Sequence, residues 1–285
     1  MAEAIAAKGG AVETGAVLEA IEVAADGSVA ALRMRDGTRV VADEYVSAMP
    51  VDVLKRLVPE AWSAMPYFRQ LDELEGIPVI NLQLWFDTKF ESSLDGLAFS
   101  RSPLLSVYAD MSRSCAEYAS DDASMLELVF APATKKYGAD RDWLGASDDA
   151  IVAATLDELR RLFPTELARA NLRKAAVVRV PRSVYAAVPG RNKYRPSQRT
   201  PVPNLTLCGC FTSQKFLGSM EGAVLAGKLA AEVVAARAVG AAAPGLKAVP
   251  GDVGAGPARA PRGVAGSDAV AFGGGATRAA AVGRA

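Results

Sequence analysis

Residues 204–212 read NLTLCGCFT, and residues 213–239 continue as SQKFLGSMEGAVLAGKLAAEVVAARAV. Leu205–Cys208 is short and apolar, and the proline directly before Asn204 favours a buried strand over a helical turn. Gly209 then begins a loop, and Ser219 is a suitable N-cap for a helix with an acidic residue in its first turn. This stretch therefore predicts a core strand, a loop and a long helix, as in an α/β fold.

The predicted helix carries small residues at a spacing of four, namely Gly218, Gly222, Ala226 and Ala230, so they share one face. Such a face lets another backbone, or the flat ring of a cofactor, come close. The free N–H groups and the positive dipole of a helix start also favour an electron-rich group. A tight helix–sheet contact in any α/β domain explains the same pattern, and these residues alone leave both interpretations open.

The same stretch resembles a known family. Residues 207–212, 214–215 and 219–228 closely resemble the C-terminal flavin-binding segment of plant and cyanobacterial phytoene desaturases, FAD enzymes of the flavin amine oxidase class. Further similar segments follow the family's order at residues 77–81, 85–87, 100–112, 124–133 and 181–185. Several motifs of this length in one order make the resemblance specific.

The resemblance implies an α/β fold, the C-terminal part of a two-domain FAD-binding oxidoreductase. That enzyme has a Rossmann-type, glutathione-reductase-like domain and a substrate domain with a mixed sheet. Residues 1–50 would belong to the FAD-binding domain, residues 51–180 to the substrate domain, and residues 181–239 to the return into the FAD-binding domain. Residues 240–285 are rich in Ala, Gly, Pro and Arg, which predicts a disordered low-complexity tail.

The activity that the resemblance implies is the FAD-dependent dehydrogenation of 15-cis-phytoene towards ζ-carotene. A plastoquinone-type acceptor would reoxidise the flavin, and the cofactor would do the chemistry. The implied location is the chloroplast, at a membrane surface, because the substrate is a lipid. No apolar run reaches the length of about 20 residues that spans a membrane, and the first residues do not read as a transit peptide. Homo-oligomers are left open.

The resemblance also implies site residues. Leu18 would lie against the adenine of FAD through its backbone, Gly209 and Cys210 near the ribityl and pyrophosphate part, and Met220 beside the isoalloxazine. Gly218 would lie at the edge of the substrate. No catalytic side chain is predicted, since a carboxylate such as that of Glu221 is more often a cap at a helix start.

Two departures from the family matter. The chain has no G-x-G-x-x-G turn, so we expect the N-terminal half that carries this turn to lie outside it. Cys210 stands where the family has Asp, and a thiol is a weak donor and a poor acceptor. An inactive remnant or an interaction protein of the same class is therefore an alternative. A ζ-carotene desaturase is another, against which Ser100–Ser112 and Met125–Ala133 argue.

The composition excludes several kinds of function. Lys and Arg together number 32, as do Asp and Glu, so no overall positive charge suggests nucleic acid. The absence of histidine excludes His-based triads, His metal ligands and imidazole proton shuttles. Three cysteines form no disulfide framework, and no metal site is predicted.

Local patterns predict the remaining elements. A helix end near residues 3–8 and a β-meander come first, the meander having turns at Asp26-Gly27 and Asp36-Gly37. Its strands and the later elements are expected at residues 11–13, 17–23, 28–34, 38–41, 44–48, 78–86, 104–109, 125–131 and 175–180 (strands) and 53–57, 66–74 and 150–163 (helices). Asp148 or Asp149 should cap the last helix. The apolar residues between Leu54 and Phe68 fit either a core or a membrane-facing surface.

Overall fold

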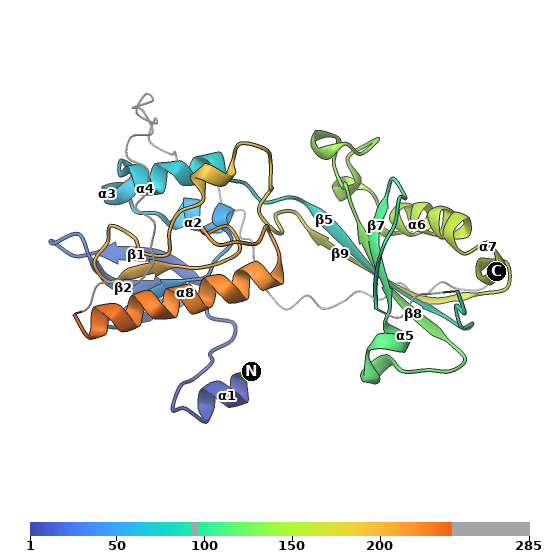
Figure 1. The fold of residues 1–285 in the computed structure, drawn as a ribbon, viewed down its shortest axis with the longest axis horizontal. Helices are drawn as coiled ribbons and strands as arrows, with labels where there is room; N and C mark the ends of the chain where they lie inside the picture. The colour runs from blue at the N-terminus through green and yellow to red at the C-terminus, as the bar shows by residue number, and fades with distance from the viewer. Residues whose placement is uncertain (93–95, 241–285) are drawn as a thin grey trace. The chain divides into compact units, whose positions relative to one another are not determined.

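The computed structural model describes residues 1–92 and 96–240, which form two compact units (Figure 1). Unit 1 combines Met1–Gly76 with the described chain from Val184 onward, and unit 2 is the single stretch Ile77–Ser183. Residues 51–76 thus belong to unit 1, whereas the sequence analysis placed them in one domain with residues 77–180. The assignment of the parts to FAD and substrate stays a prediction, and the predicted disordered tail lies outside the described residues from 241 onward.

Unit 1 begins with α1 (Ala2–Ala6) and the antiparallel meander β1 (Leu18–Val23), β2 (Val29–Met34) and β3 (Arg39–Val40). Gly27 and Gly37 have φ values of 84° and 88°, a region that favours glycine, which confirms the two predicted turns. The strand predicted at residues 11–13 is wrong: these residues are exposed and belong to no strand. They offer no buried face that would fix a pairing.

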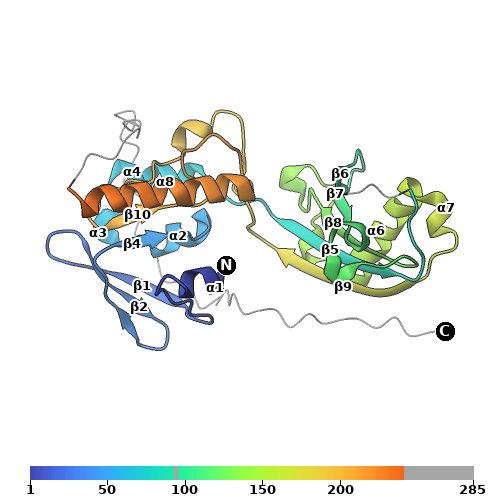
Figure 2. The ribbon, with the colours of Figure 1, turned by 60° about the horizontal axis from the view of Figure 1, so that its bottom comes forward.

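The strand of the opening stretch is confirmed as β10 (Leu205–Leu207), which pairs in parallel with β4 (Tyr45–Ser47). The helix is confirmed as α8 (Met220–Ala238), and Figure 2 shows it running beside these strands. The Ser219 hydroxyl accepts a hydrogen bond from the Gly222 N–H at 3.1 Å, so Ser219 is the predicted N-cap. The buried side of α8 consists of Gly222, Ala226, Ala230, Val233 and Ala236.

Short helices complete the core of unit 1: α2 (Val51–Leu57), α3 (Glu60–Ser63), α4 (Pro66–Arg69) and the 3-10 turns η1 (Gln70–Glu73) and η5 (Asn192–Tyr194). Leu54, Trp62, Tyr67 and Phe68 are buried in the core together with β1, β2 and β10. These four residues of the apolar stretch are therefore core, whereas Leu57, Val58 and Met65 are only partly buried. In the part of the chain that the structure describes, no helix is long and apolar enough to cross a membrane.

Unit 2 is built on a five-stranded sheet of order β6-β7-β8-β5-β9, formed by β5 (Val79–Phe86), β6 (Leu97–Phe99), β7 (Leu105–Asp110), β8 (Ser124–Phe130) and β9 (Leu172–Val180). All described neighbours are antiparallel, so the predicted mixed sheet is wrong. The chain does cross over between β8 and β9, which run in the same direction. Since they lie on either side of β5, the crossover creates no parallel neighbours.

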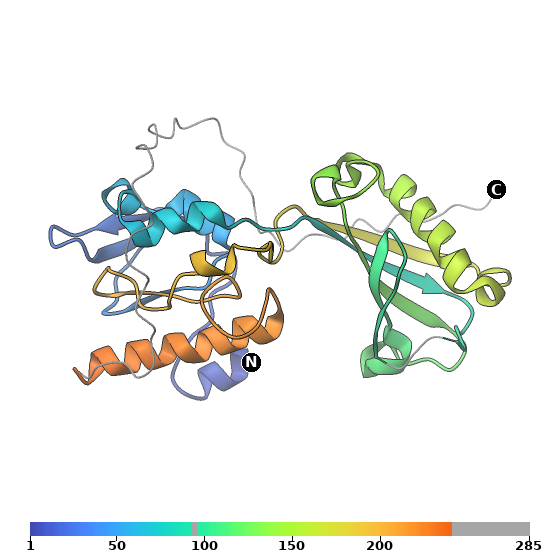
Figure 3. The same ribbon diagram turned by 45° about the horizontal axis from the view of Figure 1, so that its top comes forward.

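The crossover contains α6 (Asp148–Leu162) and α7 (Pro164–Leu167), and Figure 3 shows α6 running along the sheet of unit 2. Ile151 and Leu159 of α6 pack on the strand residues that face it, Ile80, Leu82, Leu84 and Phe86 among them. The N-cap is Ser147, whose hydroxyl accepts from the Ala150 N–H at 3.2 Å, and not the predicted Asp148 or Asp149. The two aspartates instead occupy the first turn, where their negative charges interact favourably with the helix dipole. The short elements are α5 (Met111–Ser114), η2 (Ala116–Tyr118), η3 (Lys135–Tyr137) and η4 (Trp143–Gly145).

Candidate functional site

The turn after β10 has a conformation that requires glycine. The buried Cys208 donates its N–H to the Ser47 carbonyl at 2.8 Å, which continues the pairing of β10 with β4 by one step. Gly209 follows with φ of 121°, and a Cβ on it would lie 3.1 Å from the Phe211 ring. Burial raises the pKa of the Cys208 thiol. Cys208 is thus a core residue, whereas Cys210 lies partly buried beyond the bend.

The small residues at the start of α8 are in close contact with the protein's own backbone. A Cβ on Gly218 would lie 3.0 Å from the Tyr185 carbonyl oxygen. A Cβ on Gly222 would lie 2.5 Å from the Gln214 side-chain amide nitrogen and 2.8 Å from the Leu217 carbonyl oxygen. Internal packing therefore requires both glycines.

The outer side of the same helix start is open. Met220 is 88% exposed and Leu217 is 64% exposed, and Val224 one turn further along α8 is also exposed. We call these three residues the α8 surface. An exposed apolar patch at a helix N-terminus offers a flat ring both apolar contact and unpaired N–H groups. The α8 surface therefore fits the ring part of a flavin.

The structure places the predicted site residues in unit 1, on two elements. Gly209, Cys210, Gly218 and Met220 belong to the one connection from β10 into α8. Leu18 is the first residue of β1, and it packs partly buried against the same hydrophobic core as Cys210. Met220 lies on the exposed side of α8, away from that core. The role of each residue in binding stays a prediction.

Cys210 is the position where the fit is weakest. Its carbonyl accepts hydrogen bonds from the Arg195 guanidinium at 3.0 Å and from the Gln214 side-chain amide at 3.2 Å. The backbone of this residue is thus fixed, but its thiol replaces the carboxylate of the family motif and forms only weak hydrogen bonds. The residues present fit the apolar ring better than they fit the polar part of the cofactor.

Unit 2 contributes a second surface that the sequence did not reveal. The side of its sheet opposite α6 carries Leu97 and Phe99 of β6, which are 64% and 80% exposed. They lie opposite Ala109 and Val107 of β7, and the row continues on the same face through these side chains: Val129, Glu127, Asn81, Gln83 and Val178. We call this side the open sheet face. The alternation Leu97-Ala98-Phe99 was the available signal, but three residues are too short a run to identify a strand.

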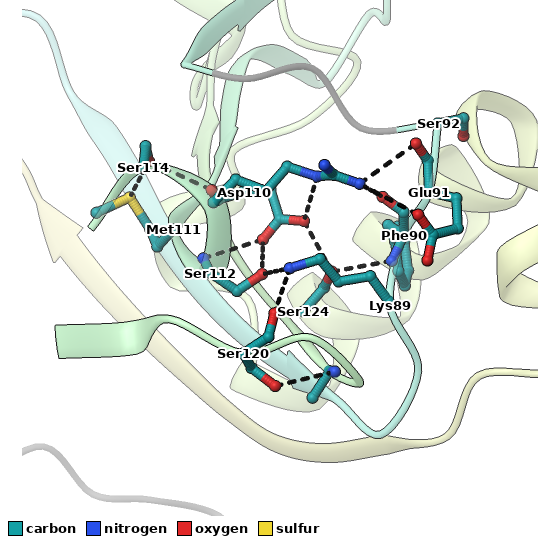
Figure 4. Close-up of polar contacts among 12 residues, drawn as sticks. Lys89, Phe90, Glu91, Ser92, Asp110, Met111, Ser112, Ser114, Ser120 and Ser124 are labelled. Atoms are coloured by element: carbon teal, nitrogen blue, oxygen red, sulfur yellow. Dashed lines mark hydrogen bonds and ion pairs between the residues drawn. The ribbon is translucent and has the colours of Figure 1, made fainter. Parts of the chain in front are cut away.

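A buried carboxylate is the centre of a polar cluster at the end of β7 (Figure 4). Asp110 accepts hydrogen bonds from the Ser112 N–H at 3.1 Å, from the Ser112 hydroxyl at 2.6 Å and from the Ser124 hydroxyl at 2.7 Å. The Arg113 Nε lies 3.8 Å from the same carboxylate. Both carboxylate oxygens are therefore satisfied inside the protein.

The outer members of this Asp110 cluster also form hydrogen bonds within the protein. The Lys89 ammonium donates to the Ser112 hydroxyl at 2.8 Å and to the Ser120 carbonyl at 2.5 Å, and the Phe90 N–H donates to the Ser124 hydroxyl at 2.9 Å (Figure 4). The cluster thus joins the ends of β5, β7 and β8. Because its donors and acceptors are used internally, we interpret the cluster as a structural element that stabilises the ends of these strands.

The architecture of the chain is that of flavin oxidases. The structure is similar to cyclohexylamine oxidase from Brevibacterium oxydans, with a TM-score of 0.60 and 19% sequence identity over 84% of this chain and 51% of that protein. At this identity the likeness shows the fold. The model of the family described as flavin containing amine oxidoreductase matches residues 1–235, and the chain belongs to this family.

Within the family, the chain is similar to carotenoid desaturases. It is 52% identical over 243 residues to a 15-cis-phytoene desaturase of Synechococcus elongatus and 49% identical over 230 residues to one of Glycine max, described as chloroplastic/chromoplastic. These alignments cover 82% and 79% of the chain, and 50% and 39% of the two relatives. A zeta-carotene desaturase of Solanum lycopersicum is 30% identical over 234 residues. The chain thus spans about half or less of the length of the curated relatives it matches.

Proposed function

We propose that this chain is part of a 15-cis-phytoene desaturase that uses FAD and passes electrons to a plastoquinone-type acceptor. The identity of about half of the aligned residues with desaturases of that name carries the proposal. The lower identity to a zeta-carotene desaturase favours phytoene over ζ-carotene as the substrate. Two hydrogens leave one C–C bond, and the quinone finally takes up the two electrons and two protons.

The residues of this chain would bind and orient the reactants. Bound FAD supplies the two-electron oxidation. The backbone at Leu18 and the turn at Gly209 and Cys210 would hold the cofactor, and Met220 on the α8 surface would provide the apolar contact for its ring. Gly218, which packs closely against the Tyr185 carbonyl oxygen, would lie at the edge of the substrate.

The exposed apolar side chains at the β6 edge of the open sheet face support a hydrocarbon substrate. Leu97 and Phe99 are strongly exposed although they lie in a strand of a well-packed sheet, and neighbouring exposed apolar side chains are typical of a binding surface. A polyene has no polar groups that require partners, so apolar contact and exclusion of water are what the protein must supply. We further propose a plastid location and attachment to a membrane surface, since the substrate dissolves in lipid.

Flavin titration of the purified chain tests this function. We expect the chain to bind FAD weakly, and Cys210→Asp to bind it about 10–100-fold more tightly, because a carboxylate restores a charged hydrogen-bond acceptor. Flavin absorbance retained after gel filtration measures the binding. Cys115→Ser in unit 2 is the matched control, and it should leave the affinity unchanged. If neither the chain nor Cys210→Asp retains flavin absorbance after gel filtration from excess FAD, the proposal for this chain is wrong.

Incubation with phytoene in liposomes and a quinone then tests the substrate. A chain that retains FAD but leaves phytoene unchanged contradicts the catalytic part of the proposal. The second candidate, an inactive remnant or interaction protein of the same family, is favoured by Cys210. This candidate predicts no flavin binding in the titration and no turnover of phytoene in the incubation.

A further inference from the structure

Arg195 lies behind the turn that connects β10 to α8, and its side chain binds the backbone of that turn. The residue is only 7% exposed. Its Nη2 donates to the carbonyls of Cys210 at 3.0 Å and Thr212 at 2.7 Å, and its Nη1 donates to the carbonyl of Gln214 at 3.1 Å. One guanidinium therefore fixes three alternate carbonyls of the same loop.

The charge of Arg195 is not neutralised by an acidic side chain. Among the described residues, no carboxylate forms an ion pair with it, and its buried Nε has no hydrogen-bond partner. Backbone carbonyl dipoles and the Tyr185 ring, whose centroid is 5.1 Å from the guanidinium carbon, provide the compensation. Burial lowers the pKa of Arg195, but a guanidinium stays protonated at neutral pH.

The same side chain connects two segments that contact predicted site residues. Tyr185, on which the guanidinium stacks, provides the carbonyl oxygen that comes closest to Gly218. Cys210, whose carbonyl Arg195 binds, lies on the turn after β10. Burying a cation without an acidic partner is costly, so its presence at this point requires a benefit that a neutral residue would not give.

We infer that Arg195 is a positioning residue of the flavin site: it draws the carbonyls of the loop inward and so fixes where Cys210 and Gly218 lie. The identity of the ligand rests on the proposed function, but the fixed loop does not. Arginine is suited to this task because its planar fork reaches several carbonyls at once, whereas lysine donates from a single nitrogen.

Hydrogen–deuterium exchange of the whole chain without ligand tests the inference. In Arg195→Lys we expect the peptide covering residues 209–219 to exchange at least about tenfold faster, because losing one charged hydrogen bond has about that effect. The N–H groups of Thr212 and Ser213, bonded to the Gly209 and Pro196 carbonyls, are the reporters. Peptides of β8 in unit 2 should not change. Arg199→Lys, a change at an exposed arginine nearby, should match the wild type.

Three results would overturn the inference. The first is an unchanged loop in Arg195→Lys, and the second is equal loosening of β4 and all of α8, which would indicate a general structural role. The third needs no variant: a wild-type loop that exchanges as fast as the exposed turn at Asp36-Gly37. FAD titration adds a separate readout, with affinity expected to fall about tenfold in Arg195→Lys. Absence of flavin binding in the wild type would contradict the proposed function and leave the exchange result valid.

Discussion

Unit 1 and unit 2 differ in the interactions that stabilise each of them internally. Unit 2 is one continuous stretch whose five antiparallel strands pack on α6 through a large apolar core. Unit 1 combines two stretches that are far apart in the sequence, and its parallel pair β4–β10 has only three residues in each strand. Short strands supply few ladder hydrogen bonds, so other groups must join the segments.

In unit 1, polar side chains that form hydrogen bonds and ion pairs join the two stretches of the chain. Asn204 exchanges two hydrogen bonds with the backbone of Val29 in β2, at 2.8 Å and 2.9 Å. Arg237 near the end of α8 binds Glu44 at 2.9 Å and the Thr206 hydroxyl at 3.0 Å. We therefore expect apolar burial to stabilise both units, and single polar contacts to join the two stretches of unit 1.

The largest effect is expected in the core of unit 2. Phe90 is fully buried, with ring centroids 4.9 Å from Phe86 and 5.3 Å from Phe163. Phe90→Ala should lower the free energy of unfolding of unit 2 by about 3–5 kcal/mol, from lost burial and the cavity that remains. Urea unfolding measures it. Phe99→Ala on the open sheet face is the control and should change stability by less than about 0.5 kcal/mol.

Tryptophan fluorescence can follow each unit separately. Trp62 lies in unit 1, and Trp85 and Trp143 lie in unit 2. A background with both unit 2 tryptophans changed to Phe therefore reports on unit 1 alone. If Phe90→Ala shifts the Trp62 transition as much as that of unit 2, the two units do not unfold independently and the comparison fails.

The next effect concerns the Asp110 cluster. Asp110→Asn removes one acceptor from a buried cluster, so either Ser112 or Ser124 loses its partner. We expect a loss of about 1.5–3 kcal/mol in the unfolding of unit 2, the range for hydrogen bonds to charged groups. Asp121→Asn at an exposed turn is the matched control. Equal stabilities of the two variants would contradict the structural role of the cluster.

A somewhat smaller effect is expected for Asn204 in unit 1. Asn204→Ala leaves the N–H and carbonyl of the buried Val29 without partners, which should cost about 1–3 kcal/mol in the Trp62 transition. Asn204→Asp keeps the acceptor for the Val29 N–H and should show an intermediate loss. A transition that moves for unit 2 instead would show that this contact does not belong to the stability of unit 1.

The smallest effect is a dependence on pH at the end of β5. Asp87 accepts hydrogen bonds from the Asn171 N–H at 2.7 Å and the Asn171 side chain at 2.9 Å, with Arg173 nearby, and these lower its pKa to about 2. The native state then favours the carboxylate, so this stabilisation is complete above the ordinary pKa of 3.8 and is lost as the pH falls towards about 2. In Asp87→Asn, the urea midpoint of unit 2 should fall less steeply between these pH values. An unchanged slope would contradict this assignment.

Local patterns predicted the elements that burial and turn chemistry fix within a few residues. The turns at Gly27 and Gly37, the cap at Ser219 and the buried strand Leu205–Leu207 all follow from neighbours along the chain. The cap of α6 was misplaced because Ser147, Asp148 and Asp149 are all good N-caps, and only the geometry selects one.

The pairing of strands could not be predicted in the same way. The resemblance suggested a mixed sheet in unit 2, but the sequence does not state that β8 and β9 lie on opposite sides of β5. β6 was missed because three residues show almost no periodicity. Pairing depends on contacts between distant segments, which local propensity does not encode.

The sequence by itself determined the family and the strand–turn–helix stretch from Leu205 to Ala238, because each depends on residue identity in a short window. Only the tertiary structure decided that Gly218 and Gly222 face the protein's own backbone while Met220 stays open. It alone placed Arg195 behind Cys210 and exposed Leu97 and Phe99 on one sheet face. The physical reason is that burial and hydrogen bonding depend on which distant segments come into contact. Periodicity in the sequence indicates that a residue is buried, but it does not indicate which residues it contacts.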